Sequence, residues 1–131
     1  MEQATRRAVL VVDDEAAVRA VLAVHLRVRL GVEVLQAADA LAALRCARAE
    51  PVALVLTDVQ MPGLDGCALV QLLKSDPATA QLPVVAMSGS GERLAAARAA
   101  GCDGVVPKPF PAGEPAATVR WWLGSAKDGA A

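Results

Sequence analysis

Five short apolar runs alternate with longer segments of helical character along this chain. The runs lie at 9–12, 32–35, 52–57, 84–87 and 105–106. In the first intervening segment apolar residues recur at helical spacing, as at Val18, Leu22 and Leu26. Strands that alternate with helices need crossover connections, which are right-handed and build a parallel sheet covered on both faces. The sequence therefore predicts an α/β fold, a doubly wound (βα)5 sandwich with a five-stranded parallel sheet.

The expected helices have recognisable ends and inner faces. Asp39 and Asp65 can cap the helices that follow them, and Gly31 and Gly101 end the helices that precede them. Pro115 suits the first turn of the last helix. The residues expected on the inner faces of the first, second, third and last helices are Val18, Val21, Leu22, His25 and Leu26; Ala40, Ala43, Leu44 and Ala47; Leu69, Leu72 and Leu73; and Val119, Trp122 and Leu123.

The length of the chain fits one domain. At 131 residues it can bury a core of its own. The apolar pattern of the last helix ends near Leu123. We therefore expect a single domain at 1–124 and a short disordered tail at 125–131.

Composition limits the partners and the compartment. A net charge of −1 and a pI near 5.8 argue against a nucleic-acid partner. Cys46, Cys67 and Cys102 are odd in number and widely spaced, which favours neither a disulfide framework nor a zinc site. The apolar run that follows Arg6-Arg7 is too short for a signal peptide. We expect a cytoplasmic protein without a membrane partner.

Reactive side chains follow four of the five expected strands. Asp13 and Asp14 come after the first, Asp58 closes the third, Ser88 follows the fourth and Lys108 follows the fifth. Ligands of an open parallel sheet bind outside the carboxyl ends of its strands, so these groups can converge at one edge. The sequence therefore predicts one site built from residues that lie far apart along the chain.

The residue types at this edge indicate phosphoryl chemistry. Three carboxylates repel one another, and a hard divalent cation with an oxygen preference, Mg²⁺ above all, would relieve that repulsion. A carboxylate can also attack phosphorus and form an acyl phosphate. The ammonium group of Lys108 and the hydroxyl group of Ser88 could hold the phosphoryl oxygens.

These residues resemble the motifs of a known family, the receiver domains of two-component response regulators, and in particular the single-domain chemotaxis regulator. The resemblance covers about residues 8–123 and implies a flavodoxin-like fold. It also implies that Asp58 takes a phosphoryl group from a sensor histidine kinase or a phosphotransfer protein. The matching stretches are Val11-Val12-Asp13-Asp14-Glu15, Asp58-Val59-Gln60-Met61-Pro62-Gly63-Leu64-Asp65-Gly66, Met87-Ser88-Gly89 and Lys108-Pro109-Phe110.

The resemblance assigns a role to each site residue. Asp14, Asp58 and the main-chain carbonyl of Gln60 would bind Mg²⁺ directly, whereas Asp13 would act through water. Ser88 and Lys108 would contact the phosphoryl group. Receivers typically have a cis Lys-Pro bond, so Lys108-Pro109 is expected to be cis. Such a domain is not an enzyme, because it catalyses only its own phosphorylation and dephosphorylation, and it signals through protein–protein contacts.

Two positions bear on the signal that follows phosphorylation. Receivers commonly carry an aromatic residue three places before the lysine, and this chain has Val105 there, so an aromatic switch is not expected. Trp121 and Trp122 are adjacent in the last helix and cannot share a face. With Trp122 inside, Trp121 is left nearer solvent as a contact for a downstream partner or for self-association. His25 has helical spacing with apolar residues, so we expect a packed or edge histidine rather than a phosphoryl relay.

Two other functions remain as alternatives. A phosphatase of the haloacid dehalogenase type would share Mg²⁺ and an aspartate nucleophile, but it needs Asp-x-Asp after its first strand, where this chain has Asp13-Asp14-Glu15. A degenerate scaffold that binds partners without phosphorylation would not need the complete acidic set with Lys108. The sequence leaves open whether the domain acts alone or belongs to a hybrid kinase.

Overall fold

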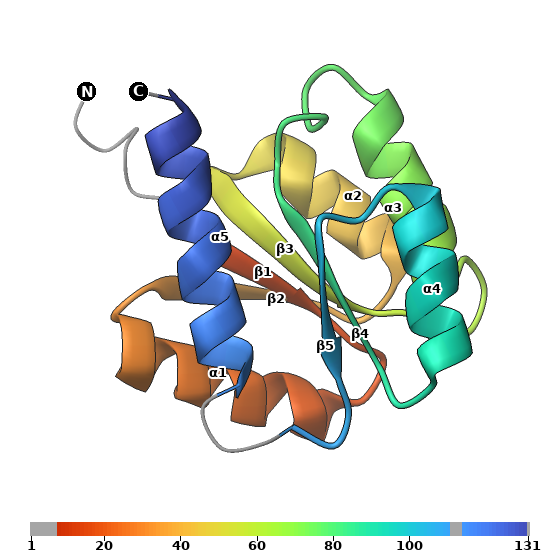
Figure 1. The fold of residues 1–131 in the computed structure, drawn as a ribbon, viewed down its shortest axis with the longest axis horizontal. Coiled ribbons are helices and arrows are strands. Elements are labelled where there is room, and N and C mark those ends of the chain that lie inside the picture. Colours follow the sequence, from red (N-terminus) through yellow and green to blue (C-terminus); the bar gives the residue numbers. More distant parts are fainter. Residues whose placement is uncertain (1–7, 111–113, 131) are drawn as a thin grey trace.

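A five-stranded parallel sheet forms the centre of the molecule (Figure 1). The computed structural model describes residues 8–110 and 114–130, the backbone alone at 114 and 125–130. The strands lie in the order β2-β1-β3-β4-β5, and each neighbouring pair is parallel. Their bounds are β1 (Ala8–Val12), β2 (Glu33–Ala37), β3 (Val52–Asp58), β4 (Val84–Ser88) and β5 (Gly104–Pro107). The predicted doubly wound, flavodoxin-like fold is confirmed.

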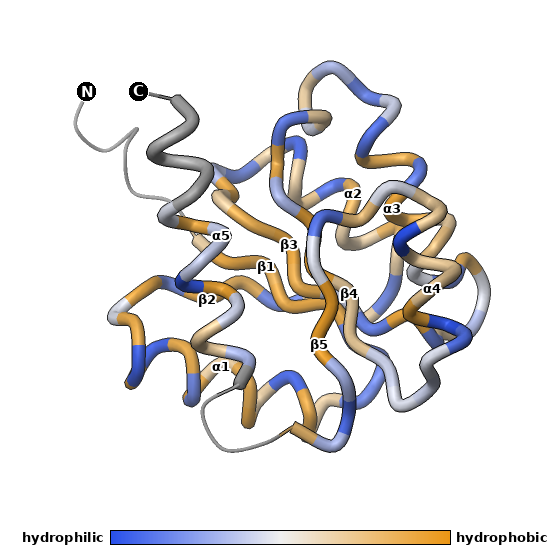
Figure 2. The backbone as a smooth tube through the Cα atoms, viewed as in Figure 1, coloured by the Kyte–Doolittle hydropathy of each residue, from blue (hydrophilic) through white to orange (hydrophobic). Residues whose placement is uncertain are grey.

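Helices cover both faces of the sheet. They are α1 (Ala16–Leu30), α2 (Ala40–Ala49), α3 (Gly66–Ser75), α4 (Gly91–Ala100) and α5 (Glu114–Ala130). In β1, Val9 and Val11 pack toward α1 and α5, whereas Leu10 and Val12 pack toward α2 and α3. A strand with both faces covered reads as a continuous apolar run, because successive side chains point to opposite faces. Figure 2 shows this as strands coloured mostly hydrophobic inside mixed helices.

The predicted caps form at the ends of the helices. Asp39 accepts a hydrogen bond from the backbone N–H of Ala42, and Asp65 accepts one from Ala68. Gly101 ends α4 with φ 113°, a left-handed conformation that glycine adopts without a steric cost. These caps fix where the loops at the carboxyl edge of the sheet begin and end.

Three details of the helices differ from the prediction. Val21 is 68% exposed and Leu72 is 42% exposed, so neither lies on an inner face. The buried stripes run instead through Ala23 and Val70, because apolar spacing alone does not tell which edge of a wide stripe meets the sheet. The backbone of α5 also continues beyond Leu123 to Ala130, where no apolar pattern marks it. The disordered tail expected at 125–131 stays a prediction, since its side chains and Ala131 lie outside the described residues.

The order of the strands opens a crevice at one place in the sheet. β1 pairs with both β2 and β3, and the helices that follow β1 and β3, α1 and α3, lie on opposite faces. Such a reversal separates the two loops at the carboxyl ends of the adjacent strands, and ligands of α/β sheets bind there. Asp13, Asp14 and Asp58 stand at this point.

Candidate functional site

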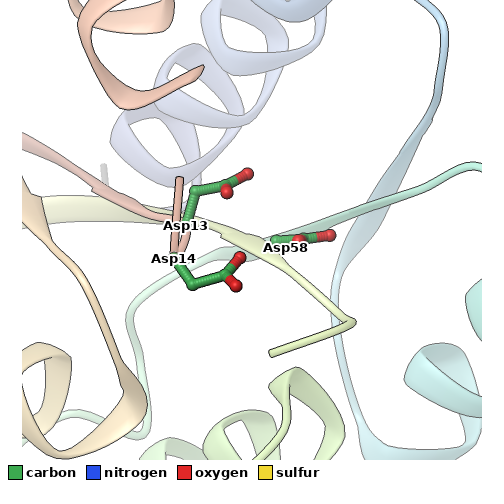
Figure 3. A group of neighbouring side chains, drawn as sticks. All are labelled: Asp13, Asp14 and Asp58. Carbon is green, nitrogen blue, oxygen red and sulfur yellow. The ribbon is translucent and has the colours of Figure 1, made fainter. Parts of the chain in front are cut away.

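Three carboxylates meet at the carboxyl ends of β1 and β3. Figure 3 shows Asp13 and Asp14 directly after β1 and Asp58 at the end of β3, with their side chains pointing to the same side. One oxygen of each carboxyl group lies within 4.8 Å of the other two. The predicted convergence of residues far apart in the sequence is therefore present.

Asp13 is held firmly inside the protein. Its side chain is fully buried, and its Oδ1 accepts a hydrogen bond of 3.0 Å from the backbone N–H of Glu15. Its other oxygen lies 3.5 Å from Nζ of Lys108. Asp14, in contrast, is exposed. The two adjacent acids thus have different environments, one fixed by protein contacts and one open to solvent.

Asp58 combines burial with access to the cleft. It is 7% exposed, and burial is the main reason that the pKa of its carboxyl group is raised above the ordinary value. The positive charge of Lys108 lowers this pKa, the nearby Asp13 raises it, and the backbone N–H of Gln60 lowers it by donating to Asp58 Oδ1 over 3.4 Å. Burial of the ionised Asp58 carboxylate therefore costs free energy unless a cation compensates its charge.

Gly66 lets α3 begin directly against the end of β3. A Cβ atom at Gly66 would overlap the main-chain carbonyl oxygen of Asp58 and would lie 2.6 Å from Cα of Val59. The backbone N–H of Gly66 donates to the carbonyl oxygen of Val59 over 2.8 Å. The Asp65-Gly66 pair of the sequence therefore both caps α3 and fixes the turn that carries Asp58.

Lys108 and Ser88 complete the site from β4 and the end of β5. Nζ of Lys108 lies 3.5 Å from Asp58 Oδ1, the same distance as from Asp13. The backbone N–H of Lys108 donates to the carbonyl oxygen of Ser88 over 2.9 Å, which holds the two segments together. The Lys108-Pro109 bond is cis, as expected. Ser88 is buried, and its Oγ accepts a hydrogen bond from the backbone N–H of Ser90.

These groups surround an open cleft. Its volume is about 530 Å³. Its lining contains both carboxyl groups and the Lys108 ammonium group, so it offers groups of opposite charge to a cation and to an anion. Its lining residues are Asp14, Glu15, Asp58, Gln60, Met61, Pro62, Ser88, Gly89 and Lys108.

Comparison with known proteins identifies the family. A family model described as the response regulator receiver domain matches residues 9–120. The chain belongs to this family. The chemotaxis protein CheY4 of Vibrio cholerae is 27% identical, with a TM-score of 0.81 over 89% of this chain and 98% of that chain. NtrX from Brucella abortus is 34% identical, with a TM-score of 0.83 over 92% of this chain and 27% of that chain.

Curated relatives are longer than this receiver domain. The transcriptional activator protein PfeR of Pseudomonas aeruginosa is 36% identical over 101 residues, which are 77% of this chain and 32% of PfeR. The chain spans less than half the length of the curated relatives that it matches first. Within the described part of the chain, no helix is both long and apolar enough to cross a membrane.

The acidic cluster of this receiver domain could hold a metal ion. Its three side-chain ligands are all carboxylate oxygens, and hard divalent cations bind oxygen. Within the described residues no other group of acids, histidines and cysteines has this arrangement. Cys46, Cys67 and Cys102 are free and half-buried.

Some residues of the site were not predicted from the sequence. Glu15 and Gly89 line the cleft, although the sequence showed them only as parts of motifs. Arg19 donates a hydrogen bond of 2.7 Å to the main-chain carbonyl oxygen of Asp13. The one signal for Arg19 was its place in the first turns of the helix that follows the acids, which is too general to assign a contact.

Proposed function

We propose that this receiver domain accepts a phosphoryl group on Asp58 in the presence of Mg²⁺ and acts as a signalling switch. The observation that supports the proposal most is the meeting of Asp58 with two further carboxylates and Lys108 at one edge of the sheet. In this proposal Asp14, Asp58 and the main-chain carbonyl of Gln60 bind Mg²⁺ directly, and Asp13 acts through water. The burial of Asp13 and the exposure of Asp14 are consistent with that division.

The reaction we propose is a transfer from a phosphohistidine. A carboxylate oxygen of Asp58 attacks phosphorus, the P–N bond breaks, and its electron pair returns to the imidazole, which leaves an acyl phosphate on Asp58. Bound Mg²⁺ would neutralise negative charge on the transferring oxygens. Lys108 holds one phosphoryl oxygen by charge, and the hydroxyl group of Ser88 donates to another.

The phosphoryl donor is a sensor histidine kinase or a phosphotransfer protein in this proposal. Relatives of the domain include a segment of the autoinducer 1 sensor kinase/phosphatase LuxN of Vibrio campbellii, 43% identical over 86 residues.

In the same proposal the signal passes on through protein–protein contacts, and Trp121 on α5 offers one for a downstream partner or a second copy. We propose no activity beyond the domain's own phosphorylation and dephosphorylation. A cytoplasmic location belongs to the same proposal, since three free cysteines suit a reducing compartment.

The test is incubation with acetyl phosphate as a small phosphodonor, followed by intact mass analysis. The domain should gain one phosphoryl group with Mg²⁺ and none with an excess of chelator. A phosphomonoester offered in parallel should not be turned over, because the proposed domain catalyses only its own phosphorylation and dephosphorylation. Sustained turnover would favour the phosphatase alternative, and no gain of mass under any condition would favour the scaffold.

A further inference from the structure

Arg19 forms a hydrogen bond to the loop that carries Asp13 and Asp14. Its Nη1 donates to the main-chain carbonyl oxygen of Asp13 over 2.7 Å, and its Nε donates to Oε1 of Gln36 over 3.3 Å. Gln36 lies in β2, and the next residue of that strand, Ala37, accepts a hydrogen bond from the backbone N–H of Asp13. The guanidinium group thus joins α1, the end of β1 and β2 at one point.

This contact fixes the plane of one peptide bond. The carbonyl oxygen of Asp13 belongs to the planar unit that also contains the backbone nitrogen of Asp14. Every polar group of Asp13 is already engaged, since its N–H, its carbonyl oxygen and both carboxylate oxygens have partners. Holding the carbonyl oxygen fixes the backbone nitrogen and Cα of Asp14, and the hydrogen bond from the N–H of Glu15 to Asp13 Oδ1 holds the next peptide. Together the two contacts set the direction in which the exposed side chain of Asp14 leaves the backbone.

Orientation and charge predict opposite effects of Arg19 on a cation in the cleft. A guanidinium group near three carboxylates repels a second cation, so as a charge alone it would weaken the binding of Mg²⁺. As the group that orients the Asp13-Asp14 peptide, it would strengthen the binding of Mg²⁺, because partners that orient metal ligands raise affinity. The sign of the effect separates the two roles.

We propose that Arg19, held in place by its hydrogen bond to Gln36, is a positioning residue that orients Asp14 toward the metal of the acidic cluster. This inference rests on the proposed function, since it assumes that the cluster binds Mg²⁺. Arg19 acts through the backbone and touches neither the metal nor the phosphoryl group.

The chain offers a matched control in the same helix. Arg27 of α1 donates from Nη2 to the main-chain carbonyl oxygen of Val34 in β2 over 3.4 Å. Like Arg19, it donates to a main-chain carbonyl oxygen and links α1 to β2, but it lies at the end of α1 away from the acids. Arg27→Ala removes one arginine and one such bond without changing the loop of Asp13.

The experiment is calorimetric titration of Mg²⁺ alone into metal-free parent, Arg19→Ala, Arg19→Lys, Gln36→Ala and Arg27→Ala. Arg19→Ala should weaken Mg²⁺ binding by about 10-fold, the lower end of what loss of an orienting partner costs a metal site. Arg19→Lys can still reach the carbonyl oxygen of Asp13, and Gln36→Ala removes only the hydrogen bond that holds Arg19. Both variants should therefore weaken Mg²⁺ binding by less. Arg27→Ala should leave the affinity within about twofold of the parent.

Each outcome decides between the roles. Equal or tighter Mg²⁺ binding by Arg19→Ala overturns the proposal, as does an equal loss in Arg27→Ala. Should Arg19→Ala fail to fold, unchanged binding by both Arg19→Lys and Gln36→Ala overturns it. A parent that binds no Mg²⁺ contradicts the proposed function itself, whereas a parent that binds Mg²⁺ with no effect of Arg19 contradicts only this inference.

Discussion

At the scale of single residues, Asp13 and Asp14 are neighbours with opposite surroundings. Asp13 is buried and its carboxylate oxygens already contact the backbone N–H of Glu15 and the ammonium group of Lys108. Asp14 is exposed at the rim of the cleft. A carboxylate that is free to turn toward a cation can bind it directly, whereas one that is already engaged acts best through water.

The two acids should therefore contribute unequally to metal binding. Asp14→Asn should weaken Mg²⁺ binding by about 10-fold or more, because a hard cation loses a charged oxygen ligand. Asp13→Asn should weaken it less. Calorimetric titration of both variants measures the difference, and equal or reversed effects would contradict the assigned roles.

Asp58 links the site to the stability of the fold. The pKa of its carboxyl group is raised, mainly by burial. A raised pKa in the folded state stabilises the fold at low pH, and this contribution is lost as the pH rises through the folded pKa. At neutral pH the ionised carboxylate therefore lowers the free energy of unfolding when no metal compensates its charge.

Asp58→Asn should raise the melting temperature at neutral pH without metal. The expected rise is about 3–5 °C, corresponding to roughly 1 kcal/mol in a domain of this size. It should shrink on acidification and on addition of Mg²⁺. Asp65→Asn is the control, because Asn caps a helix as well as Asp does. A lower melting temperature for Asp58→Asn at neutral pH would show that its charge is already compensated in the protein.

Most residues of the candidate site could be predicted from the sequence. Strand ends marked Asp13, Asp14, Asp58, Ser88 and Lys108, and parallel strands must bring their ends to one edge. The difference in burial between Asp13 and Asp14 could not be predicted in this way, because it depends on how the loop turns after β1. The contact of Arg19 was hidden for the same reason, since its acceptor is a main-chain oxygen that no sequence pattern reveals.

At the scale of elements, His25 joins α1 to the first turn of α5. Its Nε2 accepts a hydrogen bond of 3.2 Å from the backbone N–H of Ala116, a group that has no acceptor within the helix. Only the neutral imidazole can accept this bond. Burial, and then the charge of Arg29, lower the pKa of His25. The predicted packed or edge histidine thus also acts as a cap for α5, which apolar spacing could not indicate.

The cap makes the stability of the domain depend on pH. Because the pKa of His25 is lowered in the fold, its stabilising contribution is present above its unfolded pKa of about 6.5 and is lost as the pH falls through the folded pKa. At about pH 7.5 His25→Ala should melt below the parent by the equivalent of roughly 1 kcal/mol, the usual cost of a lost cap.

Thermal melts of the parent and His25→Ala across this range measure the effect. The gap between the two proteins should narrow as the pH is lowered to about 5, since the parent then loses the same bond. A gap that stays constant with pH would mean that protonation of His25 does not disturb α5.

At the scale of the whole molecule, Trp121 of α5 is not among the residues that line the cleft. Trp121 is 60% exposed, and its ring meets that of Trp122 edge-on at a centroid distance of 4.6 Å. Trp122 packs inward against the core and lies beside Gly104 of β5. The predicted division of the two tryptophans is confirmed, because Trp121 is exposed and Trp122 packs against the core. Val105 of β5 supplies no large ring that could turn inward, so we expect this surface to be largely preformed.

Trp121→Ala should weaken association of the phosphorylated domain with a downstream partner or with itself. The expected loss is about 10-fold or more, as for an exposed tryptophan at the centre of an interface, with little change in the melting temperature. Leu72→Ala is a control, since Leu72 is an exposed apolar residue of α3. Sedimentation or partner titration measures the effect, and unchanged association would remove Trp121 from the account of signalling.

Asp58 is the proposed phosphoryl acceptor, and intact mass analysis of three proteins tests this assignment. The parent, Asp58→Asn and Asp65→Asn are each incubated with acetyl phosphate and Mg²⁺, and their intact masses are compared. The parent and Asp65→Asn should each gain one phosphoryl group, and Asp58→Asn should gain none, because an amide cannot form the acyl phosphate. Phosphorylation that persists in Asp58→Asn would contradict the assignment of Asp58 as the acceptor.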